Sequence, residues 1–507
     1  MSDRNRQQPN AGPPGPREVR TVFAGLLLAL SLASLDQNIV GVALPRIVSD
    51  LGGLEHLSWV VTSFLLTSTA VTPLYGKLSD LYGRKPLFLI AIVLFLIGSS
   101  LCGLSQTMTQ LILFRGIQGL GAGGLMTLAM TTIADLVAPR ERGRYQGLFG
   151  AVFAFSSIAG PLVGGFLTDV LSWRWIFYVN LPIGVMALLL IAFGFHRPHH
   201  ALSHRIDYAG AVLLTLATTA ILLVLTMGGT SIPWSSPVIP VLSALSVMFI
   251  VLLVMREQRA AEPVLSPHLF RNRVFIVASA VMALTFMGLF GAAVFLPLYF
   301  QLVLGEAPTR AGLLLVPMTL GVIFSSFVGG QIVSRTGKYK VLPVSGLAAA
   351  ALAFLGVTAA AAAGAGLVLF EILLVTLGLG FGFVMPNLVV AIQNAVLPSE
   401  MGSATAASAF FRSLGGTFGV ALSGAIMTAE LRHLPGTAAG LDSRSLLQRG
   451  VQEIAGLPEA QRQAVIEAYR HAIGTTFLIG AVITALAFFA VLLLPEHPLR
   501  SSRHTSG

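Results

Sequence analysis

The chain has 507 residues, of which 55% are hydrophobic and only 10% are charged. A soluble protein carries roughly 25% charged residues, so this composition excludes a water-soluble protein and argues against secreted, fibrous, disordered and nucleic-acid-binding ones. The single cysteine, Cys102, lies in an apolar run, which excludes an intrachain disulfide and a thiolate metal site. We therefore expect a membrane protein that needs no metal and no cofactor and has no nucleic-acid partner.

The first segment, 1–20, is rich in Pro, Gly, Gln and Arg, which predicts a disordered tail. After it, apolar runs of about 20 residues, the length that crosses a bilayer, alternate with charged or Pro/Gly-rich breaks. They predict fourteen membrane-spanning helices, at 22–44, 57–76, 87–104, 109–134, 146–168, 175–195, 208–228, 236–255, 274–302, 309–332, 341–361, 366–395, 402–428 and 471–494. The predicted fold class is an all-α integral membrane protein.

The distribution of positive charge predicts the orientation of these helices. An even number of spans places both termini on one side of the membrane. With the termini inside, the inner segments hold 21 Lys and Arg and the outer loops hold eight, as the positive-inside rule requires. All four tryptophans then fall at outer ends or in outer loops, as in an aromatic belt. We expect both termini to be cytoplasmic.

An internal repeat predicts the domain organisation. An offset of 259 residues aligns three glycines of one helix with three of another, Gly119, Gly121 and Gly123 with Gly378, Gly380 and Gly382, and an offset of 254 aligns Gly76 and Gly83 with Gly330 and Gly337. The repeated helices run in the same direction, which predicts two parallel-related six-helix bundles plus two inserted helices. The expected parts are bundles at 21–195 and 274–494, inserted helices at 208–256, a long extracytoplasmic loop at 429–470 and a cytoplasmic tail at 495–507.

Four motifs carry a resemblance to a known family. The segment Gly76-Lys-Leu-Ser-Asp80-Leu-Tyr-Gly83-Arg84-Lys85 resembles the signature loop of the major facilitator superfamily. The other three are the stretch from Leu35-Asp36 to Pro45, Arg115-Gly-Ile-Gln118-Gly119, and Gly160-Pro161-Leu-Val-Gly164-Gly165. With fourteen helices, they resemble the drug:proton antiporter branch of that family. The second copy of the signature loop departs from the pattern, because Ser334 stands where the first copy has Asp80.

Acidic residues within the spans are the candidates for proton coupling, because a charge inside the membrane is costly. Counted along the helices at about 1.5 Å per residue, Asp36 and Arg115 lie at similar depth, so contact between them is plausible. We expect Asp36 to carry the proton and Arg115 to set its affinity in each conformation. The alternative is a permanent ion pair that only fixes helix packing. Glu371 is a second candidate for a proton site or for substrate recognition, or it is an interfacial acid exposed to water.

The signature loop and the glycine motif are the candidates for gating. Gly83 can supply the tight turn of a loop that begins at Gly76 and includes Arg84. The resemblance implies that Asp80 bridges to the opposite half and closes an inner gate; the alternative is a solvated run of charges. Gly160, Gly164 and Gly165 allow close helix packing on the outer half of their helix, and Pro161 removes one backbone donor and bends that helix. There we expect them to face the second bundle and to prevent leakage, unless they are ordinary packing surface.

Substrate residues are harder to identify, because a single residue on an apolar helix has no readable orientation. A polyspecific pocket is expected to be apolar and aromatic with a few polar groups. The candidates on suitable helices are Gln118, Phe290, Tyr299, Gln301, Asn387, Phe410, Phe411 and Arg412. Each is equally compatible with core or lipid-facing positions, and Arg412 must find a carbonyl, an amide or an anion.

The resemblance implies a proton-coupled antiporter that exports lipophilic, often cationic, drugs across a bacterial plasma (inner) membrane by alternating access. Its partners would be a small lipophilic substrate, protons and membrane lipid, and it would function as a monomer. One alternative keeps the transporter but changes its cargo to a lipid, a siderophore or a biosynthetic product. A passive channel and an intramembrane enzyme are more remote, because the sequence contains no H-E-x-x-H pair, Cys/His cluster or G-x-S-x-G elbow; we expect no catalytic residues.

Overall fold

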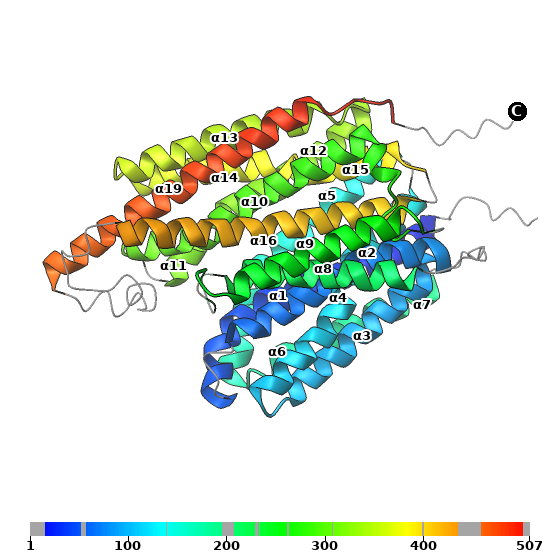
Figure 1. Cartoon of the computed structure of the whole chain (residues 1–507), viewed down its shortest axis with the longest axis horizontal. Coiled ribbons are helices and arrows are strands. Elements are labelled where there is room, and N and C mark those ends of the chain that lie inside the picture. The colour runs from blue at the N-terminus through cyan, green and yellow to red at the C-terminus, as the bar shows by residue number, and fades with distance from the viewer. Residues whose placement is uncertain are drawn as a thin grey trace, which may run out of the picture.

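A computed structural model describes residues 16–51, 57–137, 139–194, 207–228, 232, 234–260, 263–306, 308–397, 400–433 and 458–499. These residues form a bundle of long helices (Figure 1). The first seven helices are α1 (Pro16–Leu51), α2 (Leu57–Tyr82), α3 (Arg84–Leu104), α4 (Met108–Leu136), α5 (Pro139–Val170), α6 (Trp175–Tyr178) and α7 (Asn180–Gly194). The next two are α8 (Tyr208–Met227) and α9 (Val238–Glu257).

After the short 3₁₀ turn η2 (Leu269–Arg271), the described residues form eight more helices. They are α10 (Arg273–Leu302), α11 (Pro308–Leu313), α12 (Val316–Thr336), α13 (Val341–Ala362), α14 (Leu367–Gly382), α15 (Met385–Ala395), α16 (Met401–His433) and α19 (Glu459–Leu492). Among the described residues, 13 helical segments are long and apolar enough to cross a membrane. Helix α2 has 26 residues but many Ser and Thr side chains, and it accounts for the remaining predicted span. The predicted fold class is confirmed.

Three predicted spans are interrupted in the structure, and a proline explains two of the interruptions; the third lies between α6 and α7, within the span predicted at 175–195. The span predicted at 309–332 consists of α11 and α12, and the span predicted at 366–395 consists of α14 and α15. Pro317 and Pro386 lie in the first turn of α12 and α15 respectively. A proline disfavours helical geometry in the residue before it and is well tolerated at a helix start, so the chain ends one helix and begins another there.

The two halves of the chain meet mainly through two helix pairs, α2 with α16 and α5 with α12. Otherwise α1 to α7 pack largely on one another, as do α10 to α19, while α8 and α9 pair together and α8 also touches α2 and α16. In Figure 1 the halves lie close together at the end where α2 ends and α16 begins, and they diverge toward the opposite end. We call the end where the halves lie close together the expected cytoplasmic end.

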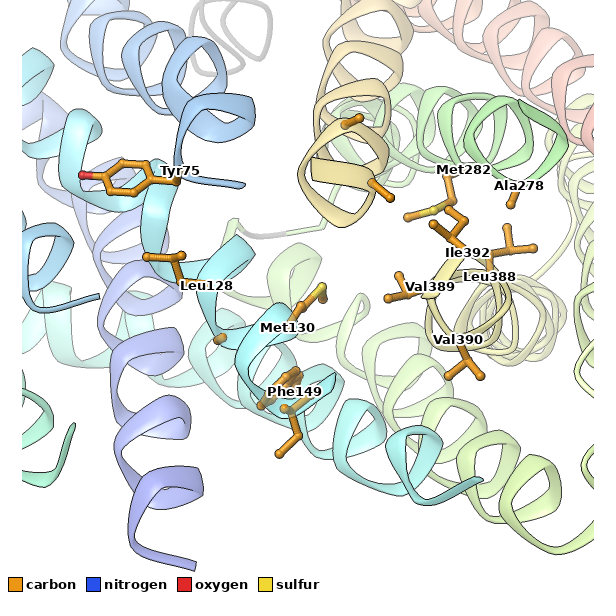
Figure 2. Close-up of a cluster of buried hydrophobic side chains, with 14 of the residues drawn as sticks. Tyr75, Leu128, Met130, Phe149, Ala278, Met282, Leu388, Val389, Val390 and Ile392 are labelled. Atoms are coloured by element: carbon orange, nitrogen blue, oxygen red, sulfur yellow. The ribbon is translucent and has the colours of Figure 1, made fainter. Parts of the chain in front are cut away.

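Buried apolar side chains from both halves form one continuous cluster near the expected cytoplasmic end. Figure 2 shows Met130 of α4 and Phe149 of α5 on one side, and Met282 of α10 and Val389 of α15 on the other. Gln393 of α15 also donates a hydrogen bond at 3.5 Å to the backbone oxygen of Met130. The halves are therefore joined by packed side chains as well as by the polar contacts described below.

The repeated glycines make equivalent contacts in the two halves. A Cβ on Gly121 would lie 2.6 Å from the backbone oxygen of Ala91 in α3, and a Cβ on Gly380 would lie 2.5 Å from that of Gly346 in α13. Gly119 and Gly378 likewise approach the backbones of α2 and α12 too closely for any side chain. These helices correspond under the repeat, so the glycines recur because the same pairs of helices pack at the same short distance.

We predict that Gly419→Ala destabilises the protein, whereas Gly424→Ala on the same helix does not. A Cβ on Gly419 would press against the backbone of Met287 in α10, but a Cβ on Gly424 would have no atom within 4 Å. Overpacking costs about 1–3 kcal/mol, while alanine in an open helical position gains about 1 kcal/mol over glycine. Thermal unfolding of the purified protein in detergent measures both, and equal midpoints for the two variants would contradict the helix contact.

Candidate functional site

Asp36 lies at the centre of a buried polar network in the first half. Its side chain on α1 is fully buried and accepts hydrogen bonds from three donors. These are Arg115 Nη1 at 2.6 Å, Gln118 Nε2 at 2.9 Å and Asn180 Nδ2 at 2.9 Å. The donors come from α4 and α7. The carboxylate is thus surrounded by polar partners and has no exposed surface in this conformation.

Arg115 is held equally firmly. It is 1% exposed, and besides Asp36 it donates to Gln118 Oε1 at 2.8 Å and to the backbone oxygen of Val60 at 3.3 Å. Its guanidinium also lies 4.1 Å from the centre of the Phe64 ring, where a cation is attracted to the ring face. The contact between Asp36 and Arg115 expected from their depths is present, and both side chains are buried.

The network includes Asn180, which sequence reasoning missed, and Gln118, which was expected to contact substrate. Asn180, the first residue of α7, bridges Asp36 and the hydroxyl of Ser99, with Nδ2 2.9 Å and 3.0 Å from them. One asparagine at the start of an apolar segment gave no signal of its orientation. Gln118, named as a substrate candidate, is fully buried between Asp36 and Arg115. In this conformation its amide is hydrogen-bonded directly to both members of the ion pair.

Asp80 connects the two halves at the expected cytoplasmic end. It lies in the last turn of α2, and its carboxylate accepts the backbone N–H groups of Gly402 at 3.1 Å and Ser403 at 2.9 Å, and the Ser403 hydroxyl at 3.2 Å. Gly402 and Ser403 form the first turn of α16, whose N–H groups have no helical partner. A carboxylate there completes the helix and complements its dipole, so Asp80 of one half caps a helix of the other.

Arg84 holds Asp80 in this position. Its Nη1 lies 2.6 Å from Asp80 and its Nε 2.8 Å from Asp135 at the end of α4, and it also donates to the Ser79 hydroxyl. Asp80 lies beyond the predicted span 57–76. Burial raises the pKa of its carboxyl above the usual value, and the charge of Arg84 and the N–H of Ser403 oppose that rise. Arg84 therefore favours the charged carboxylate that α16 binds.

Two glycines of the signature loop meet requirements that no other residue satisfies. Gly83 has φ of 90°, which allows the turn between α2 and α3, and its repeat partner Gly337 has φ of 72°. A Cβ on Gly76 would lie 2.6 Å from the backbone oxygen of Gly402. Gly76 thus lets α2 approach α16 closely enough for Asp80 to reach the helix start.

The glycine motif of α5 packs differently from the expectation. Gly160 and Gly164 do not face the second half: a Cβ on Gly160 would lie 2.6 Å from Asn38 Cβ, and one on Gly164 would lie 3.0 Å from the Ile39 backbone oxygen. Both contacts are with α1, next to Asp36. Pro161 and Gly165 lie on the same helix. The sequence shows that small residues allow close approach but not which helix approaches, and here it is the one that carries the acid.

The structure separates the remaining substrate candidates into different environments. Tyr299 is buried in an apolar cluster with Phe370 and Phe477, while Phe290 of α10 is 45% exposed. Asn387 of α15 is buried and donates to the backbone oxygen of Phe383, the residue that follows α14. Phe410 is buried, whereas Phe411 and Gln301 are part-buried. The candidates therefore do not gather into one lining, and their role as substrate residues stays a prediction.

Glu371 and Arg412 both lie within predicted spans, and neither forms an ion pair with another described residue. Glu371 of α14 is part-buried, and its Oε2 is buried with no hydrogen-bond partner among the described residues. Arg412 of α16 contacts the thioether sulfurs of Met126 and Met385. As for metal binding, the described part of the chain contains no group of three or more His, Cys, Asp or Glu side chains placed to hold an ion.

Comparison with known proteins identifies relatives along almost the whole chain. The family model of the major facilitator superfamily matches residues 26–420. A multidrug transporter protein, MdtP of Bacillus subtilis, is 38% identical over 83% of this chain and 77% of its own length. Multidrug resistance protein 3 of the same organism is 34% identical over 95% of this chain and 96% of its own.

A solved structure shows the same fold at much lower sequence similarity. The proton:xylose symporter XylE superposes with a TM-score of 0.62 at 17% identity, covering 94% of this chain and 96% of that one. At that identity the match concerns the arrangement of helices alone.

We predict that Asp80→Asn opens the expected cytoplasmic end, because an amide lacks the charge that α16 binds. The single native cysteine, Cys102, is fully buried, so a cysteine introduced at Thr69 is the only reactive thiol. Thr69 of α2 is 5% exposed and shares a 2.9 Å hydrogen bond with Ser413 of α16. Labelling of Thr69→Cys by an impermeant maleimide in inside-out vesicles should rise several-fold when Asp80→Asn is added.

Asp135→Asn is the matched control for this experiment. Asp135 also binds Arg84 but is 36% exposed and makes no hydrogen bond or ion pair with α16 among the described residues. Its replacement should leave labelling at Thr69→Cys close to the background level. Equal labelling in both variants would show that the contact with α16 does not hold the halves together.

Proposed function

This chain belongs to the major facilitator superfamily, and on that premise we propose that it is a proton-coupled antiporter that exports lipophilic drugs by alternating access. It is a multi-pass membrane transporter and not an enzyme. The relatives named as multidrug transporters support drugs as the cargo. The observation that carries the proposal of proton coupling is the fully buried Asp36, paired with Arg115 inside the first half.

The pairing suggests how the proton is exchanged. With Arg115 at 2.6 Å and two amide donors at 2.9 Å, Asp36 accepts three hydrogen bonds as a carboxylate. Departure of Arg115 favours protonation, because the nearby guanidinium stabilises the charged carboxylate and is not attracted to the neutral acid. The proposed cycle therefore alternates between a paired, charged Asp36 and an unpaired, protonated one.

The glycine motif of α5 supports this coupling through α1. Gly160 and Gly164 let α5 lie directly against Asn38 and Ile39, so a shift of α5 moves the turn of α1 that carries Asp36. Helix α5 also packs against α12 of the other half. A change in the contact between halves is thereby transmitted to the acid.

The proposal includes orientation and environment. Both termini lie on the cytoplasmic side of a bacterial plasma membrane, the closed end faces the cytoplasm, and the protein functions as a monomer surrounded by lipid. One proton crossing about 100 mV supplies about 2.3 kcal/mol, which supports a roughly forty-fold gradient of a neutral substrate. Resistance to several unrelated drugs on overexpression would support this cargo, whereas export of a single lipid, siderophore or biosynthetic product would contradict it.

We predict that Asp36→Asn abolishes proton-driven efflux in proteoliposomes, because an amide cannot release a proton. Asp50→Asn is the matched control, since Asp50 also pairs with an arginine, Arg174 at 3.9 Å, but is 44% exposed. The control should retain efflux, and an uncoupler should stop efflux by the unmodified protein. Undiminished transport by Asp36→Asn would overturn the coupling role.

Breaking a buried ion pair costs about 3–5 kcal/mol, so folding of Asp36→Asn must be checked separately. Size-exclusion profile and substrate binding without a gradient serve this purpose. A variant that binds substrate but does not transport it against a gradient supports coupling, and one that exchanges substrate freely without protons supports it further. If Asp36 only fixed packing, binding and transport would decline together.

A further inference from the structure

Arg412 is part-buried and differs from the buried Arg84 and Arg115 in having no acid beside it among the described residues. Arg115 pairs with Asp36, and Arg84 pairs with Asp80 and Asp135. Arg412, at about 16 Å from the first residue of α16 when counted at 1.5 Å per residue, has no carboxylate in contact among the residues that the structure describes. A charge inside the membrane is costly unless something opposite compensates it.

The groups that surround Arg412 are soft and uncharged. Nη1 lies 3.3 Å from the sulfur of Met385, Nη2 lies 2.8 Å from the sulfur of Met126, and the guanidinium lies 5.2 Å from the centre of the Phe286 ring. A thioether is a weak acceptor, and a ring face compensates only part of a full charge. Among the described residues, the five N–H donors of the guanidinium therefore have no strong hydrogen-bond acceptor.

The position of Arg412 is at the junction of the two halves. Met126 belongs to α4 in the first half, whereas Met385 and Phe286 belong to α15 and α10 in the second. The next residue, Ser413, shares a hydrogen bond with Thr69 of α2, and among the described residues this polar contact between α2 and α16 lies farthest from Asp80. Arg412 therefore lies beside a polar contact between α2 and α16 and touches helices of both halves.

An aromatic surface extends from Arg412 toward the diverging end. The ring of Phe286 stacks on that of Phe290 one turn further along α10, with 5.8 Å between centroids and 26° between planes. Phe290 is 45% exposed and lies against α16, where a Cβ on Gly416 would be 3.5 Å from its ring. Cation, stacked rings and polarisable sulfur are thus adjacent.

We propose that the guanidinium of Arg412 binds the anionic group of a lipophilic aromatic substrate, a carboxylate, sulfonate or phenolate, whose rings lie against Phe286 and Phe290. An anion supplies both the strong acceptor and the opposite charge that Arg412 lacks, and a carboxylate matches the fork of its N–H groups. A cation at the same place would be repelled. This inference rests on the proposed function and replaces the often cationic cargo expected from the sequence with an anionic one.

Two dyes of similar planar size and opposite charge test the proposal. Fluorescein is anionic and ethidium is cationic, and their binding to the purified full-length protein in nanodiscs is measured by fluorescence polarisation. We expect fluorescein to bind the unmodified protein more tightly than ethidium, to bind Arg412→Gln at least about ten-fold more weakly, and to bind Arg412→Lys with an intermediate loss. Arg310→Gln, in which an exposed arginine paired with Glu306 is removed, should bind like the unmodified protein.

A competition experiment needs no variant and so does not depend on how Arg412→Gln folds. 2-Naphthoate should displace fluorescein from the unmodified protein, and 2-naphthylmethylamine should not. Preference for ethidium, displacement by the amine, or fluorescein binding equal in Arg412→Gln and the unmodified protein would each overturn the proposal. Binding is measured without a proton gradient, so loss of uncoupler sensitivity in efflux would refute proton coupling while leaving this result unaffected.

Discussion

The cost of placing a charge inside the membrane explains where the polar contacts of this molecule lie. Asp36 and Arg115 compensate each other within one half, with amide donors completing the carboxylate. A translocon-type scale assigns about 3 kcal/mol to a single such charge at mid-depth, so the pair is favourable only while its members stay together. A conformational change that separates them must supply a proton, an ion or water in exchange, and this requirement links movement of the halves to ion binding.

The contact between the halves uses the same physics at a helix end. The first N–H groups of α16 need an acceptor, and Asp80 of the other half supplies it while Arg84 neutralises the carboxylate. Such a cap is strong when aligned and is lost completely when the helices separate, because its N–H groups point along one direction. A closed state held in this way can open as a single step, as alternation between two states requires. Ser334 in the second copy of the signature loop cannot make this ionic contact.

Sequence reasoning succeeded where a property depends on position along the chain and failed where it depends on orientation. The helix spans, the turn at Gly83 and the similar depth of Asp36 and Arg115 follow from motifs and from counting residues. Counting does not show which neighbour a helix face meets, so Asn180 was missed and the α5 glycines were assigned to the wrong partner helix. Pro317 and Pro386 mark helix breaks, but Pro73 and Pro297 lie inside unbroken helices. A proline alone therefore does not predict whether a helix is interrupted.

Arg412 links the proposed substrate site to the contact between α16 and the first half. Its guanidinium touches α4 and α15, and Ser413 beside it bonds to α2, so separation of α16 from the first half would remove Met126 and the Thr69 hydroxyl from this turn together. A ligand bound at Arg412 would have different neighbours in the two states, and only such a difference lets a ligand shift a conformational equilibrium. The same movement of the halves would reach Asp36 through α5 and α1. Substrate and proton would thus act on one equilibrium from separate sites, without needing to compete for a single carboxylate.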